Sequence, residues 1–272
     1  MCELLGMSAN VPTDIRFSFA GLARRGGGTG PHRDGWGIAF YEGRAARSFH
    51  DPEPSARSEM ARFIGAHPIK SCCVIAHIRQ ANSGGVSLAN THPFSRELWG
   101  RVWTYAHNGQ LRGVKKLKLG FYKPIGTTDS EHAFCWMLEQ LRAKFDRLPA
   151  MARLDREVAR LSAQLAHLGV FNMLLTDGRS LYAFCGKKLS CLTRRAPFGE
   201  ATLIDEDRKV NFAEETGPDD CVTVVATGPL TSDEPWLDIK PGTLLALRGG
   251  KVAASLHMDI PVTPAKRPTK KA

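Results

Sequence analysis

The first 110 residues alternate between short apolar runs and segments rich in glycine and polar side chains. β-Branched and aromatic residues are frequent in these runs, which favours strands over helices. Glycine, asparagine or proline often follows, as expected of turns. We therefore predict strands at residues 2–9, 37–41, 74–78 and 102–106. Turns at Asn10-Val11-Pro12, Glu42-Gly43 and Asn108-Gly109 would close the first, second and fourth.

Two helices are predicted in the middle of the chain, because the spacing of apolar residues changes to that of a helical face. The first covers residues 130–145, with Thr128 or Asp129 as its cap residue. The second covers residues 151–168 and ends before Gly169. The predicted buried faces are Ala133, Phe134, Met137, Leu138 and Leu141 in the first helix, and Leu154, Val158, Leu161, Leu165 and Leu168 in the second.

After Gly169 the apolar pattern again predicts strands, at residues 170–176, 181–184, 191–193, 221–227 and 242–247. Asp177-Gly178 and Gly249-Gly250 are predicted turns. Strands, then helices, then strands indicate an α+β protein. Two antiparallel sheets enclosed by helices fit this pattern, although the pattern alone does not require them. We predict one domain over residues 2–258 and a basic tail at residues 259–272, which we expect to be disordered.

The composition, 43% apolar and 24% charged, is that of a soluble globular protein. No run of 18 apolar residues predicts a membrane span, and the acidic Glu3 and Asp14 argue against a signal peptide. We therefore expect a cytoplasmic enzyme that does not bind membranes. The net charge is +10, and the tail at 266–271 contributes four positive charges. Elsewhere basic and acidic residues are interspersed, so a nucleic-acid partner is not expected.

Several familiar site types are not supported by the sequence. Neither H-E-x-x-H nor C-x-x-C occurs, so no metal ion and no cofactor are predicted. The segment Arg25–Gly30 resembles a phosphate loop only in its glycines, because it lacks the Gly-Lys-Ser/Thr ending. We interpret it as a flexible loop over an active site.

Seven cysteines are present, and most lie in apolar runs where small buried side chains are expected. Cys2 differs, because its small side chain permits removal of Met1. The product would carry a thiol and an α-amine on one residue. With an ordinary pKa of about 7.7–8.0, that amine is a suitable base for the thiol at neutral pH. Cysteine at position 2 is by itself a weak indication of activity.

Three further segments contain residues suited to amide chemistry. Arg79 ends a predicted strand, and its guanidinium could bind an α-carboxylate or form a structural ion pair. Asn108-Gly109 could supply two donors to an oxyanion, or form a hairpin turn. Asp129 could bind an α-ammonium group or cap the first helix. His77 and His107, at strand ends nearby, are further candidates for shaping the site.

In this order Cys2, Arg79, Asn108-Gly109 and Asp129 resemble the class II (N-terminal nucleophile) glutamine amidotransferases. The chain is similar to the stand-alone, YafJ-like branch of that family at residues 1–7, 25–28, 34–37, 77–81, 105–109, 171–175 and 226–230. The resemblance implies a four-layer αββα sandwich. It also implies that the Cys2 thiolate attacks the γ-amide of glutamine, which gives a γ-glutamyl thioester and ammonia. Asn108 and Gly109 would stabilise the oxyanion, Arg79 and Asp129 would hold glutamine, and residues 34–37 would support the nucleophile.

Two features depart from the synthases of that family. Asn82-Ser83 stand where Thr-His is common, and no synthase domain follows the amidohydrolase segment. We therefore keep three alternatives: a glutaminase, a hydrolase of γ-glutamyl peptides or amides, and an inactive fold used for binding or regulation. A separate subunit that accepts the ammonia and a homo-oligomeric assembly also remain open.

Overall fold

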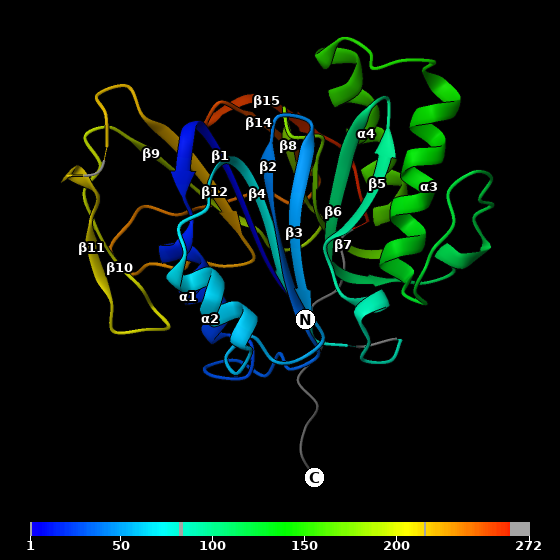
Figure 1. Cartoon of the computed structure of the whole chain (residues 1–272). Helices are drawn as coiled ribbons and strands as arrows, with labels where there is room; N and C mark the ends of the chain where they lie inside the picture. The colour runs from blue at the N-terminus through cyan, green and yellow to red at the C-terminus, as the bar shows by residue number, and fades with distance from the viewer. Residues whose placement is uncertain (1, 82–83, 215, 262–272) are drawn as a thin grey trace.

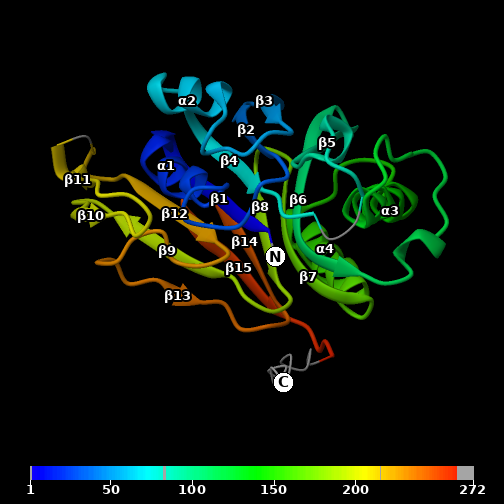
Figure 2. The ribbon, with the colours of Figure 1, turned by 90° about the horizontal axis from the view of Figure 1, so that it is seen from below.

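The computed structural model describes residues 2–81, 84–214 and 216–261. Within these ranges two large antiparallel sheets lie face to face, and each outer face carries a pair of helices (Figures 1 and 2). The first sheet contains, in spatial order, β13 (Leu237–Asp238), β9 (Ser190–Arg195), β12 (Cys221–Ala226), β1 (Glu3–Asp14), β4 (Lys70–Ile78), β2 (Trp36–Glu42) and β3 (Ala45–Asp51).

The second sheet forms the other inner layer of the sandwich. In spatial order it contains β15 (Lys251–His257), β14 (Thr243–Arg248), β8 (Leu181–Cys185), β7 (Gly169–Thr176), β6 (Arg101–Leu111) and β5 (Phe94–Leu98). A short ribbon of β10 (Glu200–Thr202) and β11 (Lys209–Asn211) lies at the margin of the first sheet (Figure 1). Three 3₁₀ turns occur in the described ranges: Leu88–Asn90, Val114–Lys116 and Phe212–Glu214.

The helices α1 (Arg16–Arg24) and α2 (Glu59–Ala66) cover the first sheet, whereas α3 (Asp129–Lys144) and α4 (Met151–Ala166) cover the second (Figure 2). This arrangement is the predicted four-layer αββα sandwich of an α+β protein. Both helices expected from the apolar spacing are present, with ends within two residues of those predicted. The expected face of α3, from Ala133 to Leu141, is fully buried.

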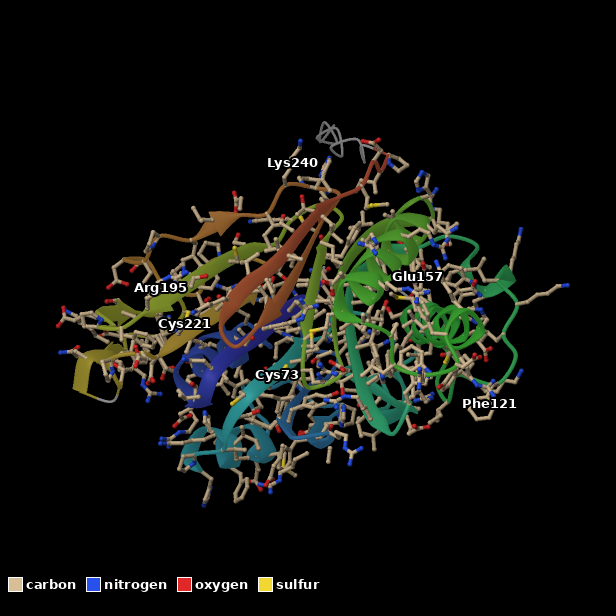
Figure 3. All side chains as sticks on the ribbon, turned by 90° about the horizontal axis from the view of Figure 1, so that it is seen from above. Cys73, Phe121, Glu157, Arg195, Cys221 and Lys240 are labelled. Atoms are coloured by element: carbon tan, nitrogen blue, oxygen red, sulfur yellow. The ribbon has the colours of Figure 1, made fainter. Side chains whose placement is uncertain are left out.

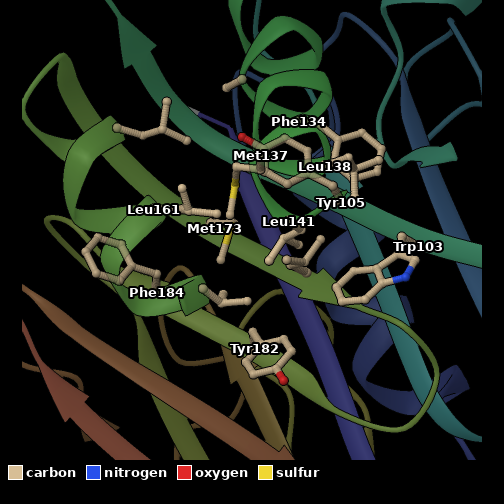
Figure 4. Close-up of a cluster of buried hydrophobic side chains, with 14 of the residues drawn as sticks. Trp103, Tyr105, Phe134, Met137, Leu138, Leu141, Leu161, Met173, Tyr182 and Phe184 are labelled. Atoms are coloured by element: carbon tan, nitrogen blue, oxygen red, sulfur yellow. The ribbon is translucent and has the colours of Figure 1, made fainter. Parts of the chain in front are cut away.

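Three apolar layers hold the sandwich together. The layer between α3, α4 and the second sheet is rich in aromatic residues, among them Trp103, Tyr105, Phe134 and Phe184 (Figure 4). A second layer joins α1 and α2 to the first sheet. The third lies between the two sheets and consists mainly of aliphatic side chains, such as Leu4 and Leu174. These side chains form the core where the inner faces of the two sheets meet.

Two predicted strand ends are wrong. The first strand does not stop at Asn10-Val11-Pro12: β1 continues to Asp14, and its pairing with β4 resumes, after a register shift, at Thr13 opposite Ser71. Nor is Asn108-Gly109 a hairpin turn, since β6 pairs with β7 as far as Leu111, opposite Gly169. In both places pairing with a strand distant in sequence overrides the local turn signal. The turn at Gly249-Gly250 is confirmed between β14 and β15.

Several elements were not predicted. They are the helices α1 and α2 and the strands β3, β5, β10, β11, β13 and β15. Most cysteines are buried as expected, and Cys73 and Cys221 lie inside the sandwich (Figure 3). The charged residues Arg195 and Lys240 lie near its margins in the same view. Cys72 is an exception, because its side chain is exposed. The basic tail beyond residue 261 lies outside the described residues.

Candidate active site

Cys2 precedes β1, the middle strand of the first sheet. Pairing of Glu3 with Ile78 brings the end of β4 alongside, so that Cys2 Sγ accepts a hydrogen bond from Gln80 N at 3.3 Å and lies 3.4 Å from Gln80 O. Burial raises the pKa of the Cys2 thiol above its ordinary value, while the Gln80 N–H and the positive charge of Arg79 act in the opposite direction. A base is therefore needed to form the thiolate at neutral pH. Met1 lies outside the described residues, so its removal stays a prediction.

Arg79 lies next to Gln80 and is almost completely buried. Its guanidinium donates to the backbone carbonyls of Asp34, Gly84 and Gly85 at 3.2–3.3 Å. The Asp34 carboxylate accepts from Ala81 N at 2.7 Å, and Arg79 N donates to Gly35 O at 2.8 Å. Residues 34–35 thus fasten both the backbone and the side chain of Arg79. Asn82-Ser83, which stand where Thr-His is common in the synthases, lie outside the described residues.

Asn108 reaches from the second sheet to the first residue of the proposed site. Its Nδ2 donates to Cys2 O at 2.5 Å and to Thr227 Oγ1 at 3.3 Å. The same Thr227 oxygen accepts from Leu4 N at 2.9 Å, so it joins β1 to Asn108. Asn108 Oδ1 is buried and has no hydrogen-bond partner among the described residues. A buried polar atom in this state is often found at a functional site.

Gly109 follows in β6 and leaves no room for a side chain. A Cβ atom there would lie 1.8 Å from Val170 O and 2.7 Å from His107 Nε2. Glycine is therefore required by the close approach of β7, not by a turn.

Asp129 begins α3, directly beside the end of β6. Its Oδ2 accepts from Leu111 N at 2.8 Å. The helix cap is Thr128, whose hydroxyl accepts from Glu131 N at 3.1 Å. The alternative role of Asp129 as the cap residue is therefore wrong. A carboxylate in the first turn interacts favourably with the helix dipole.

Three buried histidines lie behind the site. His77 stacks on His92 with ring centroids 4.2 Å apart, and its Nε2 lies 3.2 Å from His107 O. Burial lowers the pKa of His77 to about 3 and that of His92 well below its ordinary value. All three pKa values are lowered by burial, so these rings are neutral near pH 7.

His107 joins the start of α3 to β6. Its Nδ1 lies 2.8 Å from Ser130 Oγ and its Nε2 lies 3.1 Å from Val170 O. In a neutral ring the nitrogen facing the carbonyl carries the proton, so Ser130 donates to the other nitrogen. Together with the Asp129–Leu111 contact, this bond fixes Asp129 beside Gly109.

Of the five predicted site residues, Asn108 contacts the Cys2 carbonyl but does not line the cavity formed by the others. The other four, Cys2, Arg79, Gly109 and Asp129, meet at one small cavity of about 30 Å³. It has room for a few water molecules at most, so it marks where these groups converge and does not outline a whole substrate. A larger cavity of about 450 Å³ lies at the far end of β1 and contains none of them. The small cavity is lined by Cys2, Arg79, Gln80, Ala81, His92, His107, Gly109, Gln110, Thr128, Asp129 and Ser130.

The glycine-rich segment begins beside the nucleophile. Arg25 donates to Glu3 Oε2 at 3.1 Å, to Asp205 Oδ2 at 2.7 Å and to Pro229 O at 2.6 Å. It therefore ties the residue after Cys2 to two loops distant in sequence.

Four residues at or near the site had no role assigned from sequence. Gln80 contacts the thiol, His92 lines the cavity, and Thr227 and Asn172 contact Asn108. Asn172 interrupts an apolar run, and a polar residue in a strand that is buried on both faces indicates a specific hydrogen-bonding role. The other three carry no such signal, because their contacts depend on the meeting of separate strands.

Two observations bear on other functions. Across the described ranges, no His, Cys, Asp and Glu side chains gather in a group able to hold a metal ion. The helices of those ranges are all too short or too polar to cross a membrane.

Comparisons with known proteins agree with the resemblance. The family model described as "Glutamine amidotransferases class-II" matches residues 1–271. The protein named "Putative glutamine amidotransferase YafJ" from Escherichia coli (strain K12) is 60% identical over 243 residues, which cover 89% of this chain and 95% of that protein. The crystal structure of a predicted glutamine amidotransferase from Pseudomonas aeruginosa is 50% identical, with a TM-score of 0.75, over 93% of this chain and all of the other.

A more distant solved structure shares the fold. Glutamine phosphoribosylpyrophosphate amidotransferase from Bacillus subtilis is 15% identical, with a TM-score of 0.62, and the match covers 95% of this chain and 50% of that one. From the family model, the relatives and the fold, the chain belongs to the class II glutamine amidotransferases.

Proposed function

We propose that this protein hydrolyses the γ-amide of glutamine with Cys2 as its nucleophile. The observation that carries the proposal is the meeting of Cys2, Arg79, Gly109 and Asp129 at one cavity, with Asn108 bonded to the Cys2 carbonyl. These residues come from four separate segments of the chain. A nucleophile, oxyanion donors and two opposite charges are the groups that cleavage of a zwitterionic amide needs.

Removal of Met1 would give Cys2 a free α-amine. Burial raises the pKa of the thiol, so a base is needed to remove its proton. The neutral α-amine takes this proton, directly or through a water molecule. The thiolate then attacks the carbonyl carbon of the γ-amide. Asn108 Oδ1, which has no hydrogen-bond partner among the described residues, is an acceptor close to the Cys2 backbone and could orient the amine.

The tetrahedral intermediate carries its negative charge on the former amide oxygen. In this proposal Asn108 Nδ2 turns from Cys2 O to that oxygen, and the N–H of Gly109 provides the second donor. The protonated amine returns its proton to the amide nitrogen, and ammonia leaves. Water then attacks the γ-glutamyl thioester, which releases glutamate and restores the thiol.

Arg79 and Asp129 are proposed to select the α-carboxylate and the α-ammonium of glutamine. The Arg79 guanidinium now contacts three backbone carbonyls, and a carboxylate would be a stronger acceptor for the same N–H groups. Asp129 is anchored through one carboxylate oxygen and presents a negative charge at the cavity. Opposite charges on opposite sides favour an amino acid over a simple amide.

The test compares the wild type with Cys2→Ala and Cys2→Ser by ammonia and glutamate release. We expect both variants to lose activity and keep the wild-type melting temperature. A third chain, in which a bulky residue is inserted before Cys2 so that the initiator methionine is kept, should also be inactive. Full activity in Cys2→Ala, or in a chain shown by mass spectrometry to retain Met1, would contradict the proposal.

The substrate range, the partner and the location stay predictions. A panel of γ-glutamyl amides and peptides, compared by kcat/KM, separates a glutaminase from a hydrolase of larger γ-glutamyl compounds. A subunit that accepts the ammonia would raise ammonia transfer over release. The cytoplasmic location and the oligomeric state are testable by fractionation and by light scattering.

A further inference from the structure

Asn172 is a fully buried polar residue in β7, opposite Asn108 in β6. Its Nδ2 donates to the backbone carbonyl of Asn108 at 3.0 Å. Its Oδ1 accepts three backbone N–H groups in succession, from Gly186 at 3.2 Å, Lys187 at 2.9 Å and Lys188 at 3.1 Å. One amide group thus joins the turn after β8 to the residue proposed as an oxyanion donor.

These contacts are not needed to hold β6 against β7. The two strands are paired over eight residues, from Thr104 opposite Thr176 to Leu111 opposite Gly169. Asn172 adds a side-chain bond at one point of that ladder, where the Asn108 side chain leaves the sheet toward Cys2 O and Thr227. Because directly opposite residues point to the same face of a sheet, both amides lie in the layer between the sheets.

The turn that Asn172 holds also lies close to β7. A Cβ atom at Gly186 would lie 2.4 Å from Phe171 O, so the turn packs against the strand backbone. Three N–H donors on one oxygen orient the Asn172 amide, which leaves its Nδ2 directed at Asn108 O. The direction of the bond to Asn108 is therefore fixed from behind.

We propose that Asn172 is a positioning residue for amide hydrolysis, which acts by holding the Asn108 backbone where its side chain reaches the oxyanion. This inference rests on the proposed function, because it assigns Asn172 to the same oxyanion contact. A displacement of about 1 Å in such a group costs on the order of 100-fold in rate. The expected signature is a loss of kcat with KM for glutamine nearly unchanged.

Asn172→Asp tests this with little change in shape. The new carboxylate keeps an acceptor for the three N–H groups, but when ionised it places a second oxygen against Asn108 O. When protonated it can donate to Asn108 O, as the amide does. We expect kcat at pH 8 to be about 10- to 100-fold below wild type, and the ratio of variant to wild-type kcat to rise toward one as the pH is lowered to 5.5. The variant can be purified at low pH and moved to pH 8 for assay, should it fold poorly there.

A matched control lies at the other end of the same strand. Asp177 is also buried and accepts two backbone N–H groups, from Arg179 and Ser180, both at 3.0 Å. Asp177 also forms an ion pair with Arg101 at 3.0 Å, so Asp177→Ala should lower the melting temperature at least as much as Asn172→Ala, yet only Asn172→Ala should lower kcat. Rescue of kcat at low pH should be found in Asn172→Asp alone.

The inference is overturned if Asn172→Asp has wild-type kcat at pH 8, or if its kcat ratio does not change with pH. Equal losses of kcat in Asn172→Ala and Asp177→Ala would also overturn it, since they would show a purely structural role. Failure of the proposed function is a separate result: the wild type itself would then release no ammonia from glutamine and would take no label on Cys2 from diazo-oxo-norleucine.

Discussion

Gly109→Ala gives a direct test of the proposed oxyanion site. The added Cβ atom would lie 1.8 Å from Val170 O, whereas real Cβ contacts are not found under 3.0 Å. The backbone of β6 must therefore move by about 1.2 Å relative to β7, the difference of these two distances. His107 Nε2, 2.7 Å from the same atom, prevents an easy shift toward α3.

A movement of this size takes the Gly109 N–H out of the range in which it can donate to an oxyanion. We expect kcat to fall about 100-fold, which corresponds to about 2.7 kcal/mol of transition-state stabilisation. KM should rise less than kcat falls, because Arg79 lies on another segment, whereas Asp129 is held by Leu111 N of the displaced strand. Overpacking should also lower the free energy of unfolding by about 1–3 kcal/mol.

The assay is glutamate release under steady state, with two other glycines as controls. A Cβ at Gly250 would lie 1.9 Å from Cys221 O, a clash of similar severity in the turn between β14 and β15. Gly65→Ala, in α2, would meet nothing within 4 Å. Gly250→Ala should lose stability and keep kcat, and Gly65→Ala should keep both. Wild-type kcat in Gly109→Ala, or an equal loss in Gly250→Ala, would refute the reasoning.

Three other predictions concern specificity and stability. Asp129→Asn keeps an oxygen for Leu111 N but loses the negative charge, so KM for glutamine should rise at least about tenfold with little change in melting temperature. KM for glutaramic acid, which is glutamine without the α-ammonium group, should be unaffected; an unchanged KM for glutamine would argue against the ammonium contact. Phe134→Ala removes a fully buried ring that stacks on Tyr105, with ring centroids 5.0 Å apart, and should lower the free energy of unfolding in urea by about 3–5 kcal/mol. A loss under about 1 kcal/mol would count against the packing described. The pKa of His77 is about 3 in the folded protein, and that of His92 is also lowered, so below pH 6.5 the unfolded chain binds more protons than the folded one. The free energy of unfolding should therefore fall by about 1.4 kcal/mol per histidine between pH 7.5 and 5.5. In His92→Phe this loss should be smaller by the contribution of one histidine.

The sequence predicts much of the fold where apolar spacing is regular. The helices α3 and α4 follow from buried faces such as Phe134 and Leu161, and the αββα arrangement follows from the family resemblance. The helix α1 was missed because Ile15 gives it no side-chain cap and Gly21 weakens its helical propensity. The helix α2 has a good cap in Ser58 but spans eight residues, too few for a clear pattern.

The sequence allows candidate residues for the site to be chosen but does not specify how they meet. Cys2, Arg79, Asn108 and Asp129 stand in separate segments. Their meeting depends on the pairing of β1 with β4 in the first sheet and on the packing of the second sheet, which contains β6, against the first; no local pattern specifies either. Asn108-Gly109 shows the difficulty: the same two residues form a tight turn in many hairpins, but here they continue a strand because β7 pairs with them. Asn172 carries a visible signal, a polar residue among apolar ones, whose meaning required the opposite strand.

Peptide mass spectrometry of the protein after reaction with diazo-oxo-norleucine tests most directly whether Cys2 is the nucleophile. We expect one adduct, on Cys2, in a chain that begins at that residue, and loss of glutamine hydrolysis in proportion to labelling. The exposed Cys72 is an internal control, because it is the more accessible thiol and should remain unmodified. Label on Cys72 but not on Cys2, or undiminished hydrolysis by fully labelled protein, would contradict the account.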